Sequence, residues 1–326
     1  MKFFFYGDTK SNVGPQNVNR LLLEHLSHHF LWPKSKNKYL YLIEAVSKLL
    51  VCRVVVISGI SRKGYVLLRM AKFLNRKTVY IMHGCSQFER KLNGVSRNQK
   101  GIDMETGILE HADLLLPVSE KFMNWVKTQY PQYAHKTYFL YNGINTSVPK
   151  KYRTEKRKPG SIAVSGGSTL LKNNLTVVHV VNSMDKSVYL EIFGDASNGY
   201  FSDNERIFLV GEVAHEEFLR RLSRVQLFVL NSVFESFSLA TVEALLCGCS
   251  VLISECAGIT GLLELEECDL IHDPMDQDEI RRKIEYLLEN PNNERILAKL
   301  NLEEYTYPKT VERLERICGE LTNRKK

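Results

Sequence analysis

The feature that most constrains the fold is a pair of short apolar runs around one helix-forming segment. Leu227–Leu230 and Val251–Ile253 read as strands, and the segment between them ends at Gly248, a residue suited to a helix C-terminus. If a helical crossover joins two parallel strands, the turn after the first strand lies at the carboxyl edge of the sheet, where α/β folds bind ligands. Glu235 falls in that turn. Glu243 follows about two helical turns later, on a helix whose first amides can meet an anion.

The same alternation of strands and helices runs through the rest of the chain and predicts parallel sheets covered on both faces. In the first half, strands are expected at Lys2–Tyr6, Val54–Ser58, Thr78–Met82, Leu114–Val118 and Thr137–Leu140, with helices at Asn17–Leu26, Val66–Leu74 and Glu120–Lys127. The polar, basic stretch Asn145–Gly160 holds two prolines and is expected to be a linker. Beyond it, strands are expected at Ser161–Val164, Val188–Phe193 and Ile207–Val210, and helices at Asn174–Asn182, His215–Arg224, Asp276–Leu288, Asn293–Leu302 and Thr310–Leu321.

Length and cysteine usage indicate a two-domain cytosolic protein. The chain has 326 residues, enough for two ordinary domains, and its seven scattered cysteines suit a reducing compartment. Cys247 and Cys249 form a C-x-C without a second pair at zinc spacing, so core packing explains them better than a metal. The N-terminus does not read as a signal peptide, and the most apolar stretch, Tyr39–Ile60, is interrupted by charges and is not expected to cross a membrane.

Charge is divided unequally between the two halves. Residues 1–150 carry 22 Lys and Arg against 9 Asp and Glu, a net charge of +13, which leaves −6 for the remainder. This asymmetry predicts an anionic partner for the first half: nucleic acid, an anionic membrane surface or a phosphorylated acceptor. Phe30–Tyr41 interleaves aromatic residues with lysines, which fits a membrane surface and fits a solvated loop equally well. No RNA-binding module accompanies it, so we expect no nucleic acid partner.

The run from Asn231 to Ile253 resembles the signature of retaining GT-B glycosyltransferases of family 4, also called group 1. Glu235 and Glu243 stand eight positions apart, as the two glutamates of that family do, and Ala244–Ile253 resembles the apolar segment after them. On spacing alone, a solvated turn glutamate at Glu235 and a helix-face glutamate at Glu243 explain the two residues as well as a functional pair does. The resemblance implies two Rossmann-like domains, 1–148 and 149–307, whose parallel sheets face each other across a cleft. It also implies that a C-terminal helix, about 308–326, packs back onto the first domain.

Three segments of the first domain resemble family motifs. The loop after the first strand carries Gly14 but lacks the G-x-G-x-x-G spacing of a dinucleotide site, which counts against a dehydrogenase. The family has a Gly-Gly pair there, and Val13 stands at its first position. His83 follows a strand end and either faces the donor sugar or is a structural histidine. Asn17 and Ser119 are the acceptor-side candidates.

The second domain supplies most of the expected donor site. Lys172 matches the family's lysine, which grips the donor diphosphate, but Gly167 or Ser168 stands where an arginine is expected. A further segment, Gly211–Val213, resembles the one that contacts the nucleobase through its backbone.

Two other features of this domain bear on the diphosphate and on metals. Ser236 and Ser238 replace family glycines, and the amides of Ser238 and Leu239 are expected to meet the diphosphate. Asp276-Gln277-Asp278 is a formal D-x-D motif, but an acidic helix N-terminus explains it, so no metal or other cofactor is expected.

The resemblance implies a metal-independent hexosyltransferase (EC 2.4) that moves a sugar, with retention, from a nucleoside diphosphate donor, UDP-sugar being favoured. Glu235 would hold sugar hydroxyls, Glu243 the ribose and Lys172 the diphosphate, while His83 and Gly14 approach as the cleft closes. The acceptor would be a glycan or a polyprenyl-pyrophosphate-linked glycan in cell-surface polysaccharide or glycoconjugate synthesis. The enzyme would be cytoplasmic, with the inner face of the plasma membrane as a candidate peripheral site.

Two other functions remain open from the sequence. The missing arginine and the serines in place of glycines also fit a non-catalytic sugar-nucleotide-binding partner subunit of a glycosyltransferase complex. A sugar-nucleotide epimerase on the same two-domain fold would convert the donor without an acceptor. The persistence of Lys172, Glu235 and Glu243 together favours the transferase.

Overall fold

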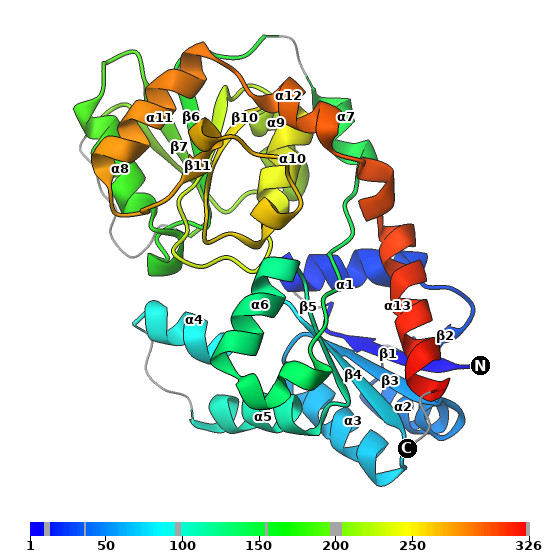
Figure 1. Cartoon of the computed structure of the whole chain (residues 1–326). Coiled ribbons are helices and arrows are strands. Elements are labelled where there is room, and N and C mark those ends of the chain that lie inside the picture. Colours follow the sequence, from blue (N-terminus) through cyan, green and yellow to red (C-terminus); the bar gives the residue numbers. More distant parts are fainter. Residues whose placement is uncertain (10–13, 36, 95–98, 154–155, 196–203, 324–326) are drawn as a thin grey trace. The chain divides into compact units, whose positions relative to one another are not determined.

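The computed structural model describes residues 1–9, 14–35, 37–94, 99–153, 156–195 and 204–323. The chain divides into two compact units. Unit 1 comprises Met1–Lys91, Val95–Gly143 and Glu303–Lys326, and unit 2 comprises Leu92–Gly94 and Ile144–Leu302. The chain therefore builds most of unit 1, then unit 2, and returns to unit 1 for its last helix (Figure 1).

The described residues of unit 1 form a five-stranded parallel sheet in the order β2-β1-β3-β4-β5. The strands are β1 (Phe3–Gly7), β2 (Phe30–Leu31), β3 (Val54–Ser58), β4 (Lys77–Met82) and β5 (Leu114–Pro117). Every residue of β3 and β5 is buried, as expected for a parallel sheet covered on both faces. The apolar runs of the first half therefore form the predicted buried sheet.

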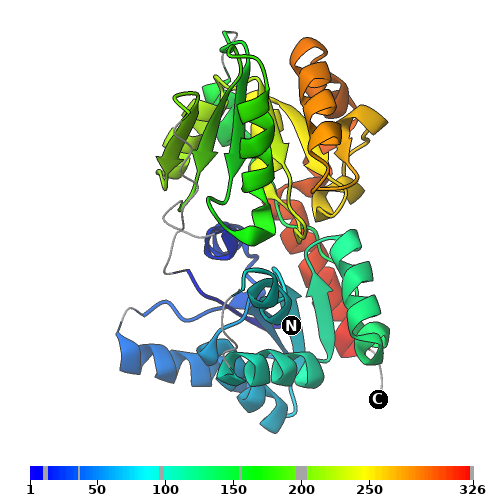
Figure 2. The same cartoon turned by 90° about the vertical axis from the view of Figure 1, so that its left-hand side faces the viewer.

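Helices cover both faces of this sheet. The helices of this part of the chain are α1 (Gly14–His25), α2 (Lys38–Val51), α3 (Arg62–Phe73), α4 (Ser86–Leu92), α5 (Gln99–His111), α6 (Glu120–Gln129) and α13 (Tyr307–Asn323), of which α4 has no buried residue. The last helix, α13, packs against α1, and the Ser27 hydroxyl donates a hydrogen bond of 2.7 Å to Glu315 on α13. On another part of the sheet, α3 packs against α5 (Figure 2). Among the described residues, no helix has the length and apolarity needed to cross a bilayer.

Two expectations for this part of the chain were wrong. Thr137–Leu140 is not a regular strand: Thr137 forms one isolated bridge to Leu115, and the segment runs beside β5 with amides bonded to it. The expected linker Asn145–Gly160 contains a short helix, α7 (Ser147–Tyr152), which packs against unit 2. Both segments are short and polar at their ends, so neither shows the periodicity that distinguishes a strand, a helix and a loop.

The described residues of unit 2 form a six-stranded parallel sheet in the order β11-β10-β9-β6-β7-β8. The strands are β6 (Ser161–Ser165), β7 (Tyr189–Phe193), β8 (Ile207–Gly211), β9 (Leu227–Leu230), β10 (Ser250–Ser254) and β11 (Leu270–Ile271). The main helices are α8 (Asn174–Ser183), α9 (His215–Leu222), α10 (Leu239–Cys247), α11 (Gln277–Glu289) and α12 (Asn293–Lys299). The strand-turn-helix-strand unit read from the sequence is thus β9-α10-β10.

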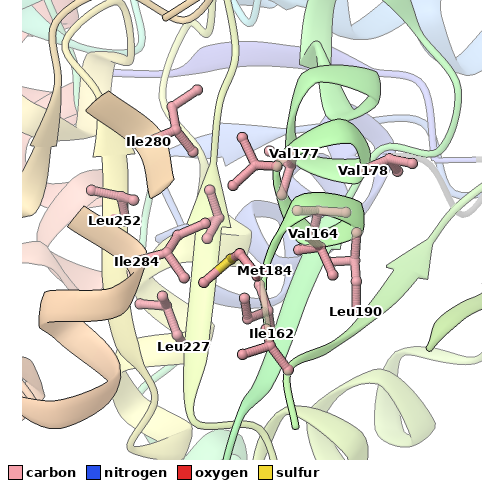
Figure 3. Packing of buried hydrophobic residues seen from close by; sticks show 14 of the residues in the cluster. Ile162, Val164, Val177, Val178, Met184, Leu190, Leu227, Leu252, Ile280 and Ile284 are labelled. Atoms are coloured by element: carbon pink, nitrogen blue, oxygen red, sulfur yellow. The ribbon is translucent and has the colours of Figure 1, made fainter. Parts of the chain in front are cut away.

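The core of unit 2 lies between this sheet and two of its helices. Figure 3 shows Ile162 of β6 and Leu227 of β9 beside Ile284 of α11, with Val177 of α8 close by. These residues are completely buried. On the other side of the sheet, α10 packs against α7 and α9. The strands are therefore held between two helical layers, which leaves their carboxyl ends open to carry the site.

In each unit, the strand order reverses beside the unit's first strand. In unit 1, β1 lies between β2 and β3, and in unit 2, β6 lies between β7 and β9. Crossovers leave such a point toward opposite faces, which opens a crevice at the carboxyl ends of the two strands. A ligand site is therefore expected after β6 and β9 in unit 2, and after β1 and β3 in unit 1.

Candidate active site

Lys172 and Glu235 meet at the reversal point of unit 2. Lys172 ends a short 3-10 turn after β6, and Glu235 lies in the turn after β9. The Lys172 ammonium forms an ion pair with Glu235 Oε2, and the two side chains are 21% and 15% exposed. A second bond joins the same loops, since the Val233 amide donates to Leu171 O at 3.0 Å. Two of the predicted catalytic residues thus form one partly buried pair that solvent still reaches.

Glycine makes room for the Lys172 side chain. Gly166 has φ +92°, and a Cβ placed on it would lie 2.5 Å from Lys172 Cγ. The stem of Lys172 therefore crosses the backbone of Gly166, which leads the ammonium to Glu235. The following residue, Asn173, adopts a left-handed conformation with φ +49°. A side chain at position 166 would displace the lysine.

Two buried asparagines join three loops beneath this pair. Asn173 Nδ2 donates to Pro274 O at 2.7 Å, and Asn231 Nδ2 donates to the same carbonyl at 3.0 Å. Asn231 is completely buried at the end of β9. These positioning residues were not predicted, although a polar residue directly after an apolar strand is a visible signal. They fix the loops that carry Lys172 and Glu235.

The backbone on either side of Glu235 is held by the loop after β10. Gly258 N donates to Glu235 O at 2.8 Å, and Ile259 N donates to Phe237 O at 2.9 Å. Glu235 also forms an isolated parallel bridge with Ala257. Its carboxylate therefore projects from a turn that is bonded on both sides, which favours a fixed orientation.

The place where the family has an arginine is filled by loop packing. Gly167 has φ +57°, and a Cβ there would lie 1.9 Å from Asp195 O. The neighbouring Ser168 is 9% exposed, and both its amide and its hydroxyl donate to that same carbonyl, at 2.8 and 3.2 Å. A side chain at position 167 would meet the Asp195 carbonyl, and Ser168 is already bonded to the same carbonyl. The departure from the family pattern is therefore built into the packing of this loop.

Helix α10 begins with a residue in an unfavourable conformation for its type. Ser238 has φ +89° and ψ +84°, and it is one of three described residues other than glycine with positive φ. Its hydroxyl lies 2.9 Å from Thr241 Oγ1 and makes no capping bond to the helix backbone. The first amides of α10, starting at Leu239, are thus not capped by the Ser238 side chain, which suits an anion-binding helix start.

Glu243 has a different partner from Glu235. Its Oε1 lies 2.8 Å from Nε2 of His215, the first residue of α9, and the two side chains are 23% and 50% exposed. The hydrogen bond with Glu243 raises the pKa of His215 above its usual value. His215 was not predicted as a site residue. The sequence feature that could have identified His215 is its position two residues after Val213, where α9 begins after β8.

Gly211 and Val213 lie on the same edge but touch neither ion pair. Gly211 ends β8 with φ +76°, and its carbonyl accepts a hydrogen bond of 2.8 Å from Gly194 N. Val213 is partly exposed between β8 and α9. Three predicted donor residues therefore belong to two ion pairs along one edge of the sheet, Lys172 with Glu235 and Glu243 with the unpredicted His215.

A hydrogen-bonded chain occupies the reversal point of unit 1. Asn19 Nδ2 donates to Asp8 O at 2.9 Å, so Asn19 Oδ1 accepts the Ser58 hydroxyl at 2.6 Å. Because Ser58 donates its only hydroxyl proton to Asn19, its oxygen can only accept from His83. His83 Nε2, 2.8 Å from Ser58 Oγ, therefore donates the hydrogen bond between them. Although His83 is only partly covered from solvent, burial among protein atoms lowers its pKa to about 4. His83 is therefore a neutral imidazole protonated on Nε2.

The other predicted residues of unit 1 have different positions. Gly14 is the first residue of α1 and is exposed, and Asn17 is partly exposed one turn later. Val13 lies outside the described residues. Ser119 is completely buried, and its hydroxyl caps α6 by accepting the Phe122 amide at 3.0 Å. Its burial and its capping role give Ser119 a structural function, so we do not include it in the proposed acceptor site.

A pocket of about 700 Å³ opens at the carboxyl ends of β1, β2 and β3. Its lining combines three cations, Lys34, Arg62 and Lys63, and one carboxylate, Asp8, with aromatic rings that include Trp32 and Tyr41. The Lys34 ammonium lies 5.0 Å from the centre of the Trp32 ring, and the Lys63 ammonium 5.1 Å from that of Tyr41. Such a lining suits a ligand with negative charge and a flat or apolar portion.

Residues 202–301 match the family of glycosyl transferases group 1. The matched residues lie within unit 2 and include Glu235 and Glu243. This confirms the resemblance read from the Glu235–Glu243 region. No curated protein matches the chain in sequence.

Solved structures extend the likeness to the whole fold. Anabaena HepE in complex with UDP-glucose is 14% identical with a TM-score of 0.71, covering 98% of this chain and 100% of that one. Sucrose-phosphate synthase from Thermosynechococcus elongatus is 16% identical with a TM-score of 0.65, covering 99% and 89%. The lipopolysaccharide outer core galactosyltransferase WaaB is 14% identical with a TM-score of 0.65, covering 98% and 99%. The fold is therefore GT-B, as predicted.

Proposed function

We propose that this protein is a retaining, metal-independent glycosyltransferase that transfers a hexose from a UDP-sugar to a glycan or lipid-linked acceptor. The observation that carries the proposal is the Lys172–Glu235 pair at the reversal point of a group 1 glycosyltransferase domain. UDP as the nucleotide is supported by the UDP and UDP-glucose complexes of HepE, and a hexose by HepE and the galactosyltransferase WaaB.

The Lys172–Glu235 pair suggests how the donor enters. When a sugar nucleotide binds, the Lys172 ammonium turns to the diphosphate and the Glu235 carboxylate accepts hydroxyls of the sugar. The exchange keeps both charges partnered, so neither is left bare in a partly buried site. The first amides of α10, from Leu239, add donors to the diphosphate, and Glu243 holds the ribose while His215 stays beside it. The leaving phosphate then takes the proton of the attacking hydroxyl on the same face of the sugar.

The pocket of unit 1 is the proposed acceptor site. Lys34, Arg62 and Lys63 supply positive charge, and Trp32 and Tyr41 supply faces on which a sugar ring or an apolar chain packs. A glycan carried on a polyprenyl pyrophosphate has both features. An Arg62→Ala variant is expected to raise the KM for such an acceptor about tenfold while leaving UDP release by donor hydrolysis unchanged.

The test is release of UDP from UDP-glucose, UDP-galactose and their N-acetyl forms, with wild-type protein and Glu235→Ala. Release by the wild type that the substitution abolishes, and that EDTA leaves intact, is the expected result. The missing arginine supports a second candidate, a non-catalytic sugar-nucleotide-binding partner subunit. Donor binding by calorimetry without UDP release, with every acceptor tried, would establish that alternative instead. Loss of activity in EDTA would end the metal-independent assignment.

A further inference from the structure

Helix α2 presents apolar side chains to solvent along most of its length. Its inward residues Ala45 and Leu49 are buried in unit 1. On the opposite side, large apolar side chains are exposed by half or more: Tyr39 75%, Leu40 55%, Leu42 57%, Ile43 65%, Leu50 53% and Val51 65%. The solvent side of a surface helix is ordinarily polar, whereas α2 has only Lys38, Glu44, Ser47 and Lys48 as polar aliphatic or charged residues. None of the described residues covers this outer face of α2.

The neighbouring helix α3 extends this surface. Its outward side shows Phe73, 91% exposed, and Val66, 51% exposed. The two helices are linked at both ends: Lys63 stacks over Tyr41 near their starts, and Arg76 Nη2 donates to Leu50 O at 2.6 Å near their ends. The exposed residues of α2 and α3 thus form one surface, which we call the α2–α3 face. It is larger than a scatter of single exposed residues, so it calls for a partner.

The segment that carries the α2–α3 face is strongly basic. Residues 30–77 contain eleven Lys and Arg and a single acidic residue, Glu44, for a net charge of +10. Glu44 itself is paired with Lys48 at 3.0 Å. Exposed cations including Arg53, Arg62 and Arg69 alternate with the apolar residues. A partner must therefore offer an apolar layer and dense negative charge together.

We propose that the α2–α3 face docks on an anionic phospholipid bilayer. Leucine, isoleucine and phenylalanine enter the boundary between headgroups and acyl chains, and lysine and arginine meet the anionic headgroups above it. A second copy of the chain fits less well, because two such faces would bring two charges of +10 together. RNA fits less well because the exposed residues of α2 are mostly aliphatic and give bases little to stack on.

The docked face lies next to the proposed acceptor pocket. Tyr41 and Lys63, which link α2 to α3, also line that pocket. A chain anchored in the bilayer could thus place its phosphorylated head among Lys34, Arg62 and Lys63. This consequence rests on the proposed function, whereas docking itself does not.

The test is co-sedimentation with vesicles of equal parts phosphatidylcholine and phosphatidylglycerol, and with vesicles of phosphatidylcholine alone. We expect binding to the anionic vesicles that weakens with added salt. Leu50→Asp and Ile43→Asp should each reduce binding about tenfold or more, because a carboxylate would enter the bilayer interface. The matched control is Tyr286→Asp on α11 of unit 2, where Tyr286 is 50% exposed, and it should bind as the wild type does.

Charge and oligomerisation have separate tests. Arg53→Glu with Arg69→Glu should weaken binding by about tenfold or more at low salt, since each basic residue near an anionic surface contributes about 1 kcal/mol. Trp32, beside this surface, should show a blue-shifted emission on binding in a Trp125→Phe background, since the chain has two tryptophans. Equal binding to neutral vesicles, or wild-type binding by Leu50→Asp, would overturn the proposal. A dimer in light scattering that Leu50→Asp dissociates, without vesicle binding, would assign the face to a second copy.

Discussion

The two units carry their candidate sites at the same topological place but build them differently. In unit 2, the loops after β6 and β9 are joined by the Lys172–Glu235 ion pair and by the shared carbonyl of Pro274. In unit 1, the corresponding edge is an open basic pocket of about 700 Å³. Under the proposed function, the bonded edge of unit 2 would hold the donor and the open edge of unit 1 the acceptor.

Each edge also contains a histidine, and the two are perturbed in opposite directions. His83 of unit 1 is kept neutral because burial lowers its pKa to about 4. His215 of unit 2 is held in its charged form over a wider pH range, because its hydrogen bond with Glu243 raises its pKa. Unit 1 thus presents a neutral imidazole, His83, which can donate and accept hydrogen bonds. Unit 2 presents a charged pair, His215 with Glu243. The surroundings of the two histidines therefore stabilise opposite protonation states of the same side chain.

The largest expected effect concerns the Lys172–Glu235 pair. Lys172→Gln and Glu235→Gln should each lower the rate of sugar transfer about 100-fold or more, because each removes a charge that the transition state uses. The double variant should be little worse than either single one, since the pair acts as a unit. Rates of UDP release give the comparison. The exposed ion pair Lys309–Glu312 of unit 1, at 2.9 Å, is the control, and its substitution should change nothing.

Additive losses in that experiment would contradict the shared role of the two residues. They would mean that Lys172 and Glu235 contact the donor independently, and that the ion pair seen without donor is incidental. Unit 2 would then be a less connected site than its loop bonds suggest.

The second expected effect is on the rigidity of unit 2. Gly167→Ala should lower the free energy of unfolding of unit 2 by about 3 kcal/mol, because the new Cβ meets Asp195 O and φ is positive. Gly211→Ala is the matched control: φ is also positive, but nothing lies within 4 Å, so about 1 kcal/mol is expected. Both tryptophans, Trp32 and Trp125, belong to unit 1. Tryptophan fluorescence therefore follows unit 1 in urea, and far-UV circular dichroism follows both units.

Equal losses for the two glycines would show that the Asp195 loop yields easily. An arginine at position 167 would then be sterically acceptable, and the departure from the family pattern would need another explanation. A shift in the fluorescence transition would show that the two units do not unfold separately.

The third prediction sets the two histidines against each other. The folded-state pKa of His83 lies below its unfolded value, so its contribution to stability is present above about pH 6.5 and is lost as pH falls toward 4. The folded-state pKa of His215 is raised, so its contribution is present below about pH 6.5 and is lost as pH rises through the folded value. His83→Gln should flatten the acid limb of the unit 1 transition. His215→Gln should flatten the alkaline limb of unit 2.

The measurement is urea unfolding at a series of pH values, with the two signals described above. Titration of the imidazole protons by NMR would check the two pKa values directly. If His83 titrated near its ordinary pKa, the ring would not be held neutral by burial, and the two histidines would not differ in the way described.

The sequence predicted most of unit 2 and less of unit 1. The β9-α10-β10 unit was readable because apolar runs, a helix-forming segment and Gly248 follow one another in the order that a crossover needs. Lys172 and Glu235 were readable because each lies in a short contiguous motif of its own. No helix was assigned to α2 from the sequence, because large apolar residues lie on several sides of it and weaken the amphipathic period.

Contacts between distant segments were the main omission. The pairing of His215 with Glu243 joins residues 28 positions apart. The hydrogen-bonded chain from Asp8 to His83 joins the loop after β1, helix α1, the end of β3 and the residue after β4. The fit of Gly167 against Asp195 depends on backbone atoms from another loop. Such contacts depend on how loops meet at a sheet edge, and no local pattern of residues shows which loops will meet.

The smallest expected effect tests the start of α10, where Ser238 replaces a family glycine. Ser238→Gly should relieve about 1 kcal/mol of backbone strain and lose about 1 kcal/mol with the bond to Thr241, so unit 2 should keep its stability. Ser238→Ala keeps the strain and loses the bond, so it should be less stable than the glycine variant by about 1 kcal/mol. Far-UV circular dichroism in urea resolves the two, and Thr241→Val controls for the bond alone.

The order of these two variants decides what the serine does. If glycine is the more stable, the positive φ of Ser238 is a strained conformation held by the surrounding loops, and the helix start keeps its geometry at a cost in stability. Donor affinity should then be equal in the two variants, because both leave the amides of α10 in place. If alanine is as stable as glycine, the conformation carries no strain and the Ser238–Thr241 bond alone explains the serine. The rigid edge of unit 2 would then rest on its side-chain pairs and not on its backbone.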